Sequence, residues 1–204
     1  MKDDLRSRNR TFDSRSIASF MDGYVSLLSR AFEAVDRDQL AAAQAALVDA
    51  AENGKTIFAI GNGGSAAISD HLVCDLSKGT HHDQHPTLRA QSMTSNAALY
   101  SAMANDLGFE NVFAGQIGLY GRPGDILIAI SSSGESANIV RAVAAAQGLG
   151  MTVIGLSGFS GGQLRRTADI SLHVPIDNYG IVEDAHQAIM HVIAQYTAAL
   201  RDQG

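Results

Sequence analysis

The stretch KTIFAIGNGGS at residues 55–65 decides the fold class. Its first half is a short apolar run without polar alternation, which is typical of a strand buried on both faces of a parallel sheet. Its second half is a glycine-rich loop, and the residues that follow, up to Ser77, have the pattern of a helix. A buried strand, a glycine loop and a helix in this order predict one unit of a parallel α/β sheet.

Three further apolar runs have the same character. They lie at residues 126–130, 151–156 and 168–174, and residues 87–92 form a weaker candidate. Helical patterns separate these runs, and the last helical pattern extends from about Gly180 to Arg201. Apolar strands that alternate with helices predict a parallel sheet covered on both faces.

Two helical patterns precede the predicted sheet, at Ser14–Val35 and Gln39–Glu52. Apolar residues in the first recur at spacings of three and four, as in an amphipathic helix. We expect both helices to pack on the sheet unit or on a partner subunit. Because the sequence shows no linker or repeat, we expect a single domain over residues 15–204 behind a flexible arm at residues 1–14.

The composition excludes several classes of protein. The chain has 204 residues, one cysteine and a net charge of −6. One cysteine excludes an internal disulfide framework and a cysteine-based zinc finger, and the acidic balance disfavours a nucleic-acid binder. The N-terminus lacks the apolar segment of a secretory signal, and the longest uncharged stretch, Val143–Leu164, holds too many glycines for a membrane span. We therefore expect a cytoplasmic protein that binds neither nucleic acid nor membrane.

Two loops that follow predicted strands are suited to phosphate. The first is GNGGS at residues 61–65, and the second is SSSGES at residues 131–136. Backbone N–H groups at a helix start point at a bound anion, and the helix dipole favours its charge. Glycine and serine are also ordinary turn and cap residues, but two such loops at one edge of a sheet favour a phosphate site. Neither loop has the lysine of a nucleotide-binding P-loop or the glycine spacing of a dinucleotide fingerprint.

A second polar group lies on two predicted helices. His71 and Asp75 are four residues apart and share one helix face. The last predicted helix concentrates polar residues in apolar surroundings, namely Glu183, Asp184, His186 and His191. Two histidines and two carboxylates from two helices suit Zn²⁺ or another divalent ion, and they also suit proton transfer. A lone histidine or aspartate on a helix is more often solvated, so it is the combination that indicates a site.

The chain resembles the sugar isomerase (SIS) domain in three segments, namely residues 61–65, residues 130–138 and the helix from Glu183 to His191. Within that family the chain resembles the bacterial phosphoheptose isomerases over about residues 15–200. The resemblance implies a three-layer α/β/α sandwich of flavodoxin-like type, with a five-stranded parallel sheet and added N-terminal helices. It also implies a homotetramer with active sites at subunit interfaces. The implied reaction converts sedoheptulose 7-phosphate to D-glycero-D-manno-heptose 7-phosphate through an enediol.

The resemblance also implies roles for particular residues. Phosphate and sugar would be bound by Asn62, Gly63, Gly64, Ser65, Asn96, Asp106, Ser131, Ser132, Ser133, Ser136 and Glu183. One Zn²⁺ or other divalent metal per subunit would be held by His71, Asp75, Glu183 and His191. Asp75 would be the catalytic base, and His191 the general acid and base.

The chain departs from the family pattern at three of these positions. Asp75 and Glu183 stand where the family has glutamate and glutamine, and Asn96 replaces a family aspartate. Carboxylates at both 75 and 183 would make the metal site more anionic, which favours a divalent cation.

Two alternatives stay open at this point. One is a non-catalytic SIS protein that binds a phosphosugar or a partner protein, including an adaptor of a replication initiator. The other is an isomerase of a different phosphosugar. The joint presence of His71, Asp75 and His191 favours an enzyme, because binding proteins can keep the phosphate loops and lose the acid and base.

Overall fold

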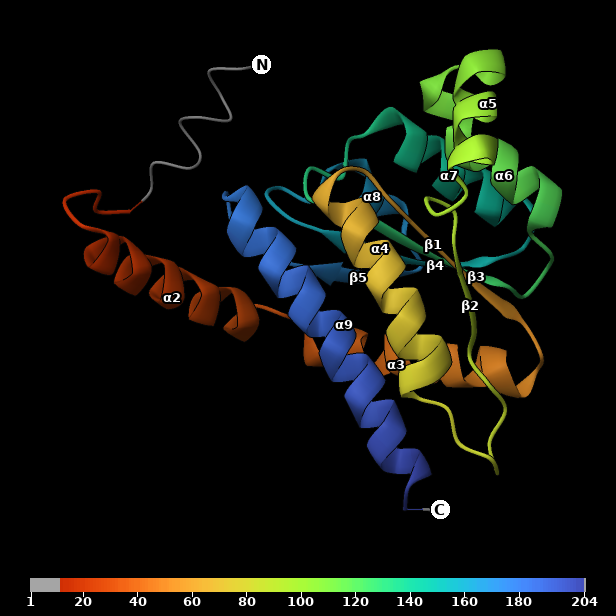
Figure 1. Cartoon of the computed structure of the whole chain (residues 1–204), viewed down its shortest axis with the longest axis horizontal. Helices are drawn as coiled ribbons and strands as arrows, with labels where there is room; N and C mark the ends of the chain where they lie inside the picture. Colours follow the sequence, from red (N-terminus) through yellow and green to blue (C-terminus); the bar gives the residue numbers. More distant parts are fainter. Residues whose placement is uncertain (1–11, 204) are drawn as a thin grey trace.

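Five parallel strands form one sheet in the order β2-β1-β3-β4-β5 (Figure 1). The structure is a computed structural model that describes residues 12–203, so most of the expected flexible arm lies outside the described residues. The strands are β1 (Thr56–Gly61), β2 (Arg89–Ser92), β3 (Ile126–Ser131), β4 (Thr152–Ser157) and β5 (Ile170–His173). The α/β prediction is confirmed, and so is the weaker strand at residues 87–92, which forms the edge strand β2.

Helices cover both faces of the sheet, and two of them, α2 and α3, precede the first strand. They are α2 (Ile17–Glu33), α3 (Arg37–Glu52), α4 (Gly64–Cys74), α5 (Ala97–Leu107), α6 (Val112–Tyr120), α7 (Ala137–Gly148), α8 (Gly162–Thr167) and α9 (Tyr179–Arg201). A π-helical turn, η1 (Asp75–Gly79), continues α4, and a short 3-10 turn, η2 (Phe109–Asn111), precedes α6. The sequence analysis did not predict α5 or α6. Helix α5 rises away from the sheet in Figure 1 and has no fully buried residue, because Tyr100, Met103 and Ala104 are only partly covered by the core.

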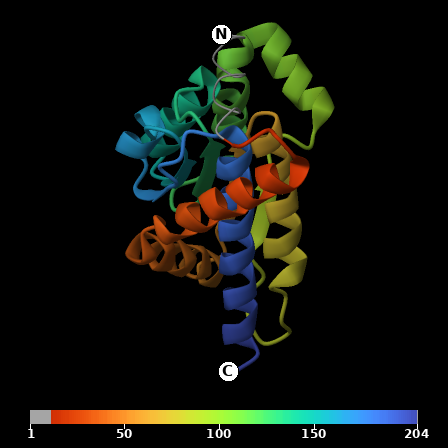
Figure 2. The same cartoon turned by 90° about the vertical axis from the view of Figure 1, so that its left-hand side faces the viewer.

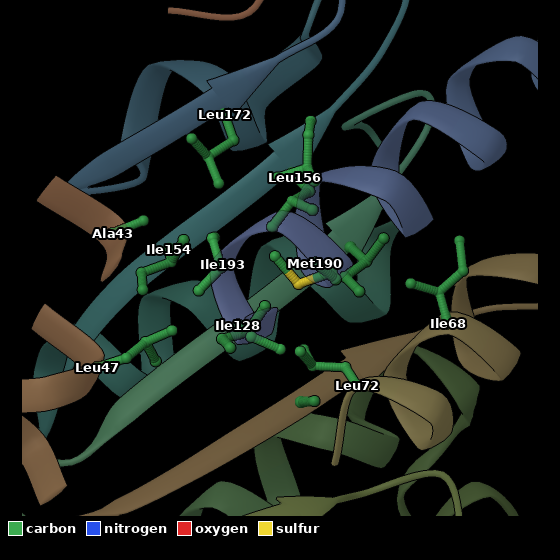
Figure 3. Close-up of a cluster of buried hydrophobic side chains, with 14 of the residues drawn as sticks. Ala43, Leu47, Ile68, Leu72, Ile128, Ile154, Leu156, Leu172, Met190 and Ile193 are labelled. Carbon is green, nitrogen blue, oxygen red and sulfur yellow. The ribbon is translucent and has the colours of Figure 1, made fainter. Parts of the chain in front are cut away.

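One face of the sheet is covered by α3, α4 and α9. Side chains that alternate along β3, such as Ile126, Ile128 and Ile130, point to this face and are at most 2% exposed. Figure 3 shows Leu72 of α4 and Met190 of α9 in one cluster with Ile128 of β3, and Ala43 and Leu47 of α3 reach the same cluster from the other side. The intervening residues of β3 point to the opposite face, where they pack on α6, α7 and α8.

Helices α4 and α9 run side by side in the same direction, with their N-termini at the loop end of the sheet (Figure 1). Facing residues of the two helices therefore meet along their whole shared length. Helix α2 lies across α9 on the outside of this layer, as Figure 2 shows, so the first predicted helix does pack on the sheet unit. No helix within residues 12–203 combines the length and apolar character needed to cross a membrane.

Candidate active site

The two glycine and serine loops lie next to each other at the carboxyl end of the sheet. Strand β1 is flanked by β2 on one side and β3 on the other, and Gly61 pairs with Ile130 at the end of the β1–β3 ladder. The helix after β1 covers one face of the sheet, and the helix after β3 covers the other. The strand order therefore changes direction between these loops, and such a point opens the crevice where α/β sheets bind ligands.

Glycines shape the first loop and the start of α4. Gly63 has φ +55°, which favours glycine, and it caps α4 without a side-chain hydrogen bond. A Cβ added at Gly64 would lie 2.4 Å from Oε2 of Glu183, so the carboxylate of Glu183 lies directly over the N-terminus of α4. Burial, followed by the charge of Asp184, raises the pKa of Glu183. Glu183 thus occupies the position at this helix terminus where an anion is favoured.

The serines of the second loop fall into two groups. Ser131 Oγ accepts a hydrogen bond from the Gly134 N–H at 3.2 Å, and Ser133 Oγ accepts one from the Glu135 N–H at 3.3 Å, so both hydroxyls hold the turn. Ser132 is 5% exposed, and its Oγ has no partner within residues 12–203. Ser136 caps α7 without a side-chain hydrogen bond. Ser65, the second residue of α4 on the other side of the crevice, is 4% exposed.

Two asparagines join the loops across the crevice. Nδ2 of Asn62 donates to Oδ1 of Asn138 at 2.9 Å, and Nδ2 of Asn138 donates to Oδ1 of Asn62 at 2.8 Å. Asn138 is 2% exposed, whereas Asn62 is half-buried. The sequence analysis named Asn62 but missed its partner.

His71, Asp75 and His191 meet between α4 and α9. Oδ2 of Asp75 lies 3.5 Å from Nε2 of His71 and 3.4 Å from Nε2 of His191, and the two imidazole rings are 5.0 Å apart. All three side chains are partly exposed. The π-helical turn begins at Asp75, and such turns are frequent at functional sites. The structure thus brings together three of the four residues that the resemblance implied for a metal.

The donors of this cluster fit a divalent metal. One ligand atom from each of His71, Asp75 and His191 can be chosen so that all three lie within 4.8 Å of one another. Two imidazole nitrogens and one carboxylate oxygen are a usual ligand set for Zn²⁺, with further positions left open. Glu183 is not part of this group, because its carboxylate lies over Gly64 two helical turns away.

Gln187 is a further polar residue of the cluster that the sequence analysis missed. Its Nε2 lies 3.2 Å from Nε2 of His191. Gln187 stands four residues after Glu183 and four before His191, so the three share one face of α9. That spacing is the signal that could have identified it.

Two other predicted site residues, Asn96 and Asp106, make hydrogen bonds only to residues near them in the sequence among residues 12–203. Asn96 caps α5, with its Oδ1 accepting from the Leu99 N–H at 3.1 Å. Asp106, near the end of the same helix, accepts from Nδ2 of Asn105 at 2.8 Å. Within residues 12–203, neither shares a hydrogen bond with the two loops, so their proposed substrate contacts stay predictions.

Tyr24 connects α2 to the part of α9 that carries Glu183. Its hydroxyl donates to Oδ2 of Asp184 at 2.6 Å. Burial, and then this bond to a carboxylate, raise the pKa of Tyr24, so the tyrosine stays a neutral donor. The contact fixes the first turns of α9 relative to α2.

We expect the stability of the fold to depend on pH through His186. It is fully buried on the sheet side of α9, and burial lowers its pKa from 6.5 to about 4, although the backbone of Ser157 opposes part of this shift. The unfolded chain binds this proton more readily, so stability is complete above pH 6.5 and falls towards pH 4, by about 3 kcal/mol in full. We expect His186→Leu to reduce this pH dependence in urea unfolding. Burial also lowers the pKa of His173, so part of the pH dependence of stability should remain in the variant. If the unfolding free energies of variant and wild type fell in parallel between pH 6.5 and 4.5, His186 would be excluded as the cause.

Comparison with known proteins places this site in a family. The SIS domain model matches residues 19–158. A phosphoheptose isomerase of Geotalea daltonii is 39% identical over 155 residues, which cover 76% of this chain and 80% of that protein. The structure of a phosphoheptose isomerase from Francisella tularensis aligns with a TM-score of 0.81 at 34% identity, covering 90% of this chain and 96% of that one. The enzyme of the same name from Neisseria gonorrhoeae gives a TM-score of 0.82 at 29% identity, covering 90% and 97%. The chain therefore belongs to the SIS domain family and, within it, to the phosphoheptose isomerases.

Proposed function

We propose that this protein interconverts sedoheptulose 7-phosphate and D-glycero-D-manno-heptose 7-phosphate. The observation that carries the proposal is the arrangement along α4. The phosphate loop ends at its first residue, and the His71, Asp75 and His191 cluster lies two turns further on, about 10 Å along the axis. An extended phosphosugar held by its phosphate at the loops has a length of this order, which would bring its carbonyl end to the cluster. The names of the relatives at 34% to 39% identity support the same substrate.

Moving a proton between two neighbouring sugar carbons needs a base at the carbons and a proton donor at the oxygens. Asp75 is the base in this proposal, because its carboxylate is partly exposed between the two imidazoles. His191 would donate to, and take protons from, the oxygens at which negative charge develops. A divalent metal bound by His71, Asp75 and His191 would supply positive charge for those oxygens. The partial exposure of these side chains leaves them accessible to the sugar.

The loops would anchor the other end of the substrate. The hydroxyls of Ser133 and Ser136 and the backbone N–H groups at the start of α7 border the crevice from one side. Helix α4 begins on the other side, near Ser65 and Asn62, but the Glu183 carboxylate already covers its N-terminus, so the phosphate charge would rest on the second loop and the start of α7. Fixing the phosphate in this way orients the reacting carbons, which is a large part of catalysis for small substrates.

The alternative of a non-catalytic binding or adaptor protein has less support. Such a protein needs the phosphate loops. It does not need a carboxylate within 3.5 Å of two imidazoles at the place where the carbonyl end of a loop-bound sugar would lie. Isomerisation of a shorter phosphosugar uses the same chemistry, so the choice of substrate has to be decided by experiment.

Purified protein with added Zn²⁺ should convert sedoheptulose 7-phosphate faster than pentulose or hexulose phosphates, measured as aldose product by chromatography. Faster conversion of a shorter ketose would change the substrate, and conversion of none would favour the binding protein.

Metal binding should depend on the three clustered residues. We expect His71→Ala to weaken Zn²⁺ binding by about a hundredfold, because it removes one of the ligands. Gln187→Leu should weaken binding by about tenfold, because it removes the polar neighbour that orients His191. Competition with a coloured chelator measures both affinities without any turnover. His81, exposed on the loop after η1, provides the control variant His81→Ala, and an equal loss in this control would show that the effect is not specific to the cluster.

The proposal covers residues 15–204 as one unit in the cytoplasm, assembled as a homotetramer. Exposed apolar side chains support assembly, since Ile17, Met21 and Val25 form a stripe on α2. Val192, Tyr196 and Leu200 form a similar stripe on α9. Light scattering in solution measures the assembly directly, and a monomer at working concentration would contradict this part.

A further inference from the structure

The paired amides of Asn62 and Asn138 suggest a role that goes beyond contact with the sugar. We propose that Asn138 is a positioning residue, which fixes the amide of Asn62 and the spacing between the two phosphate loops. Affinity for the phosphate end of the ligand would then depend on a side chain that is itself 2% exposed. The identity of the phosphosugar rests on the proposed function, but the loop geometry does not.

A third hydrogen bond fixes the orientation of the two amides. Oδ1 of Asn138 also accepts a hydrogen bond from the Ile139 backbone N–H at 3.0 Å. A backbone N–H can only donate, so the atom of Asn138 at this position has to be the oxygen. Asn62 must then present its nitrogen to that oxygen and its own oxygen to Nδ2 of Asn138. The first turn of α7 therefore determines which atoms of Asn62 remain for a ligand.

The two loops are anchored to different parts of the sheet. The second loop is tied to the β4 side of the sheet, because the Ser132 carbonyl accepts from the Gly158 N–H and the Gly134 carbonyl accepts from the Leu164 N–H. The first loop leads into α4 on the opposite face of the sheet. Beyond the β1–β3 ladder, the asparagine pair is the hydrogen-bonded link between the two loops among the described residues. The pair therefore spans the crevice and limits its width.

The two asparagines differ in burial. Asn138 has no access to water that could replace Asn62, so breaking the pair would leave a buried amide unsatisfied. Asn62 is half-buried and faces the crevice, which leaves its second amide hydrogen and second lone pair free for a ligand. One asparagine thus contacts the ligand, and the other holds it in place.

The test combines direct binding with a double-mutant cycle. Calorimetry gives the Kd for inorganic phosphate and for sedoheptulose 7-phosphate, and steady-state kinetics separates KM from kcat. We expect Asn138→Leu, which keeps the volume but removes both bonds, to raise Kd and KM by about tenfold or more. In an Asn62→Ala background the same change should have less than about a threefold effect, since the partner is already gone. Gln116→Met removes another buried amide, which bonds the Met93 carbonyl away from the loops, and it should leave Kd unchanged.

A Kd within about twofold of wild type for Asn138→Leu, or an equal effect in both backgrounds, would overturn the proposal. If Asn138→Leu does not fold, Asn138→Asp replaces it, because this variant keeps the acceptor for Ile139 but cannot donate to Asn62. It should also bind phosphate more weakly, and unchanged binding would count against the proposal. Wild-type protein that binds phosphate but does not convert sedoheptulose 7-phosphate would refute the proposed function alone. Wild-type protein that does not bind phosphate would refute the positioning role as well.

Discussion

Asp75→Asn should reduce isomerase turnover by about a thousandfold, because an amide cannot take the proton that a general base removes. The side chain keeps its shape and can still hydrogen-bond to His71 and His191, so the thermal midpoint should change little. The measurement is kcat with sedoheptulose 7-phosphate at saturating metal, together with the Kd for the same sugar, which should stay within a few-fold of wild type.

The matched control for this variant lies on the same helix. Asp70 is exposed and accepts a hydrogen bond from Thr94 at 2.7 Å, outside the histidine cluster. Asp70→Asn removes the same charge from α4 and should leave kcat unchanged. His191→Ala should be nearly as damaging as Asp75→Asn. Normal turnover in both the Asp75 and the His191 variants would refute the assignment of base and acid.

Gly134→Ala should be the most destabilising small substitution in the second loop. Gly134 has φ +66°, and a Cβ there would lie 2.0 Å from the carbonyl oxygen of Gly161. Gly162 faces it with φ +57°, and its own Cβ would lie 2.6 Å from the carbonyl carbon of Gly134. The loop and the turn before α8 therefore pack backbone against backbone. The positive φ and the required shift together should cost about 2–4 kcal/mol of unfolding free energy.

Urea unfolding measures this loss as a lower midpoint at an unchanged slope. Phosphate binding should weaken in the same variant, because the turn carries the hydroxyls and N–H groups of the loop. Gly118→Ala is the matched control, since nothing lies within 4 Å of a Cβ at this exposed position in α6. It should stabilise the protein by up to about 1 kcal/mol, because alanine favours a helix. Equal midpoints for the two alanine variants would contradict the packing described here.

Much of the fold is predictable from the sequence because its strands are buried on both faces. A run such as Ile126–Ile130 has no polar alternation, and the loop after it ends in a helix, so its type and place in a parallel sheet follow from local pattern. Helix α5 is different, because its partly buried residues Tyr100, Met103 and Ala104 lie in a run that is apolar almost throughout, so the face that packs on the core does not stand out. Its existence depends on a cap by Asn96 and on contacts with α6, neither of which a short window reveals.

The candidate site was predictable only as far as spacing along single elements allows. His71 and Asp75 share a helix face by their spacing. His191 belongs to a group of polar residues on the last predicted helix, and the resemblance to known isomerases selected it from that group. The pairing of Asn62 with Asn138 joins positions 76 residues apart, and the packing of Glu183 on Gly64 joins two helices. Contacts of this kind depend on how α4, α7 and α9 are placed by the sheet. The metal itself, and the sugar, stay predictions that rest on these contacts.

The most direct test of the central claim is proton exchange at the sugar carbons. Sedoheptulose 7-phosphate is incubated with the protein and Zn²⁺ in D₂O and followed by NMR. We expect deuterium at C2 of the aldose product and, through the reverse reaction, at C1 of the remaining ketose, since the enediol exchanges its proton with solvent. Both signals should be lost in Asp75→Asn. Binding of the sugar without deuterium at either carbon, in the wild-type protein with metal present, would contradict the account.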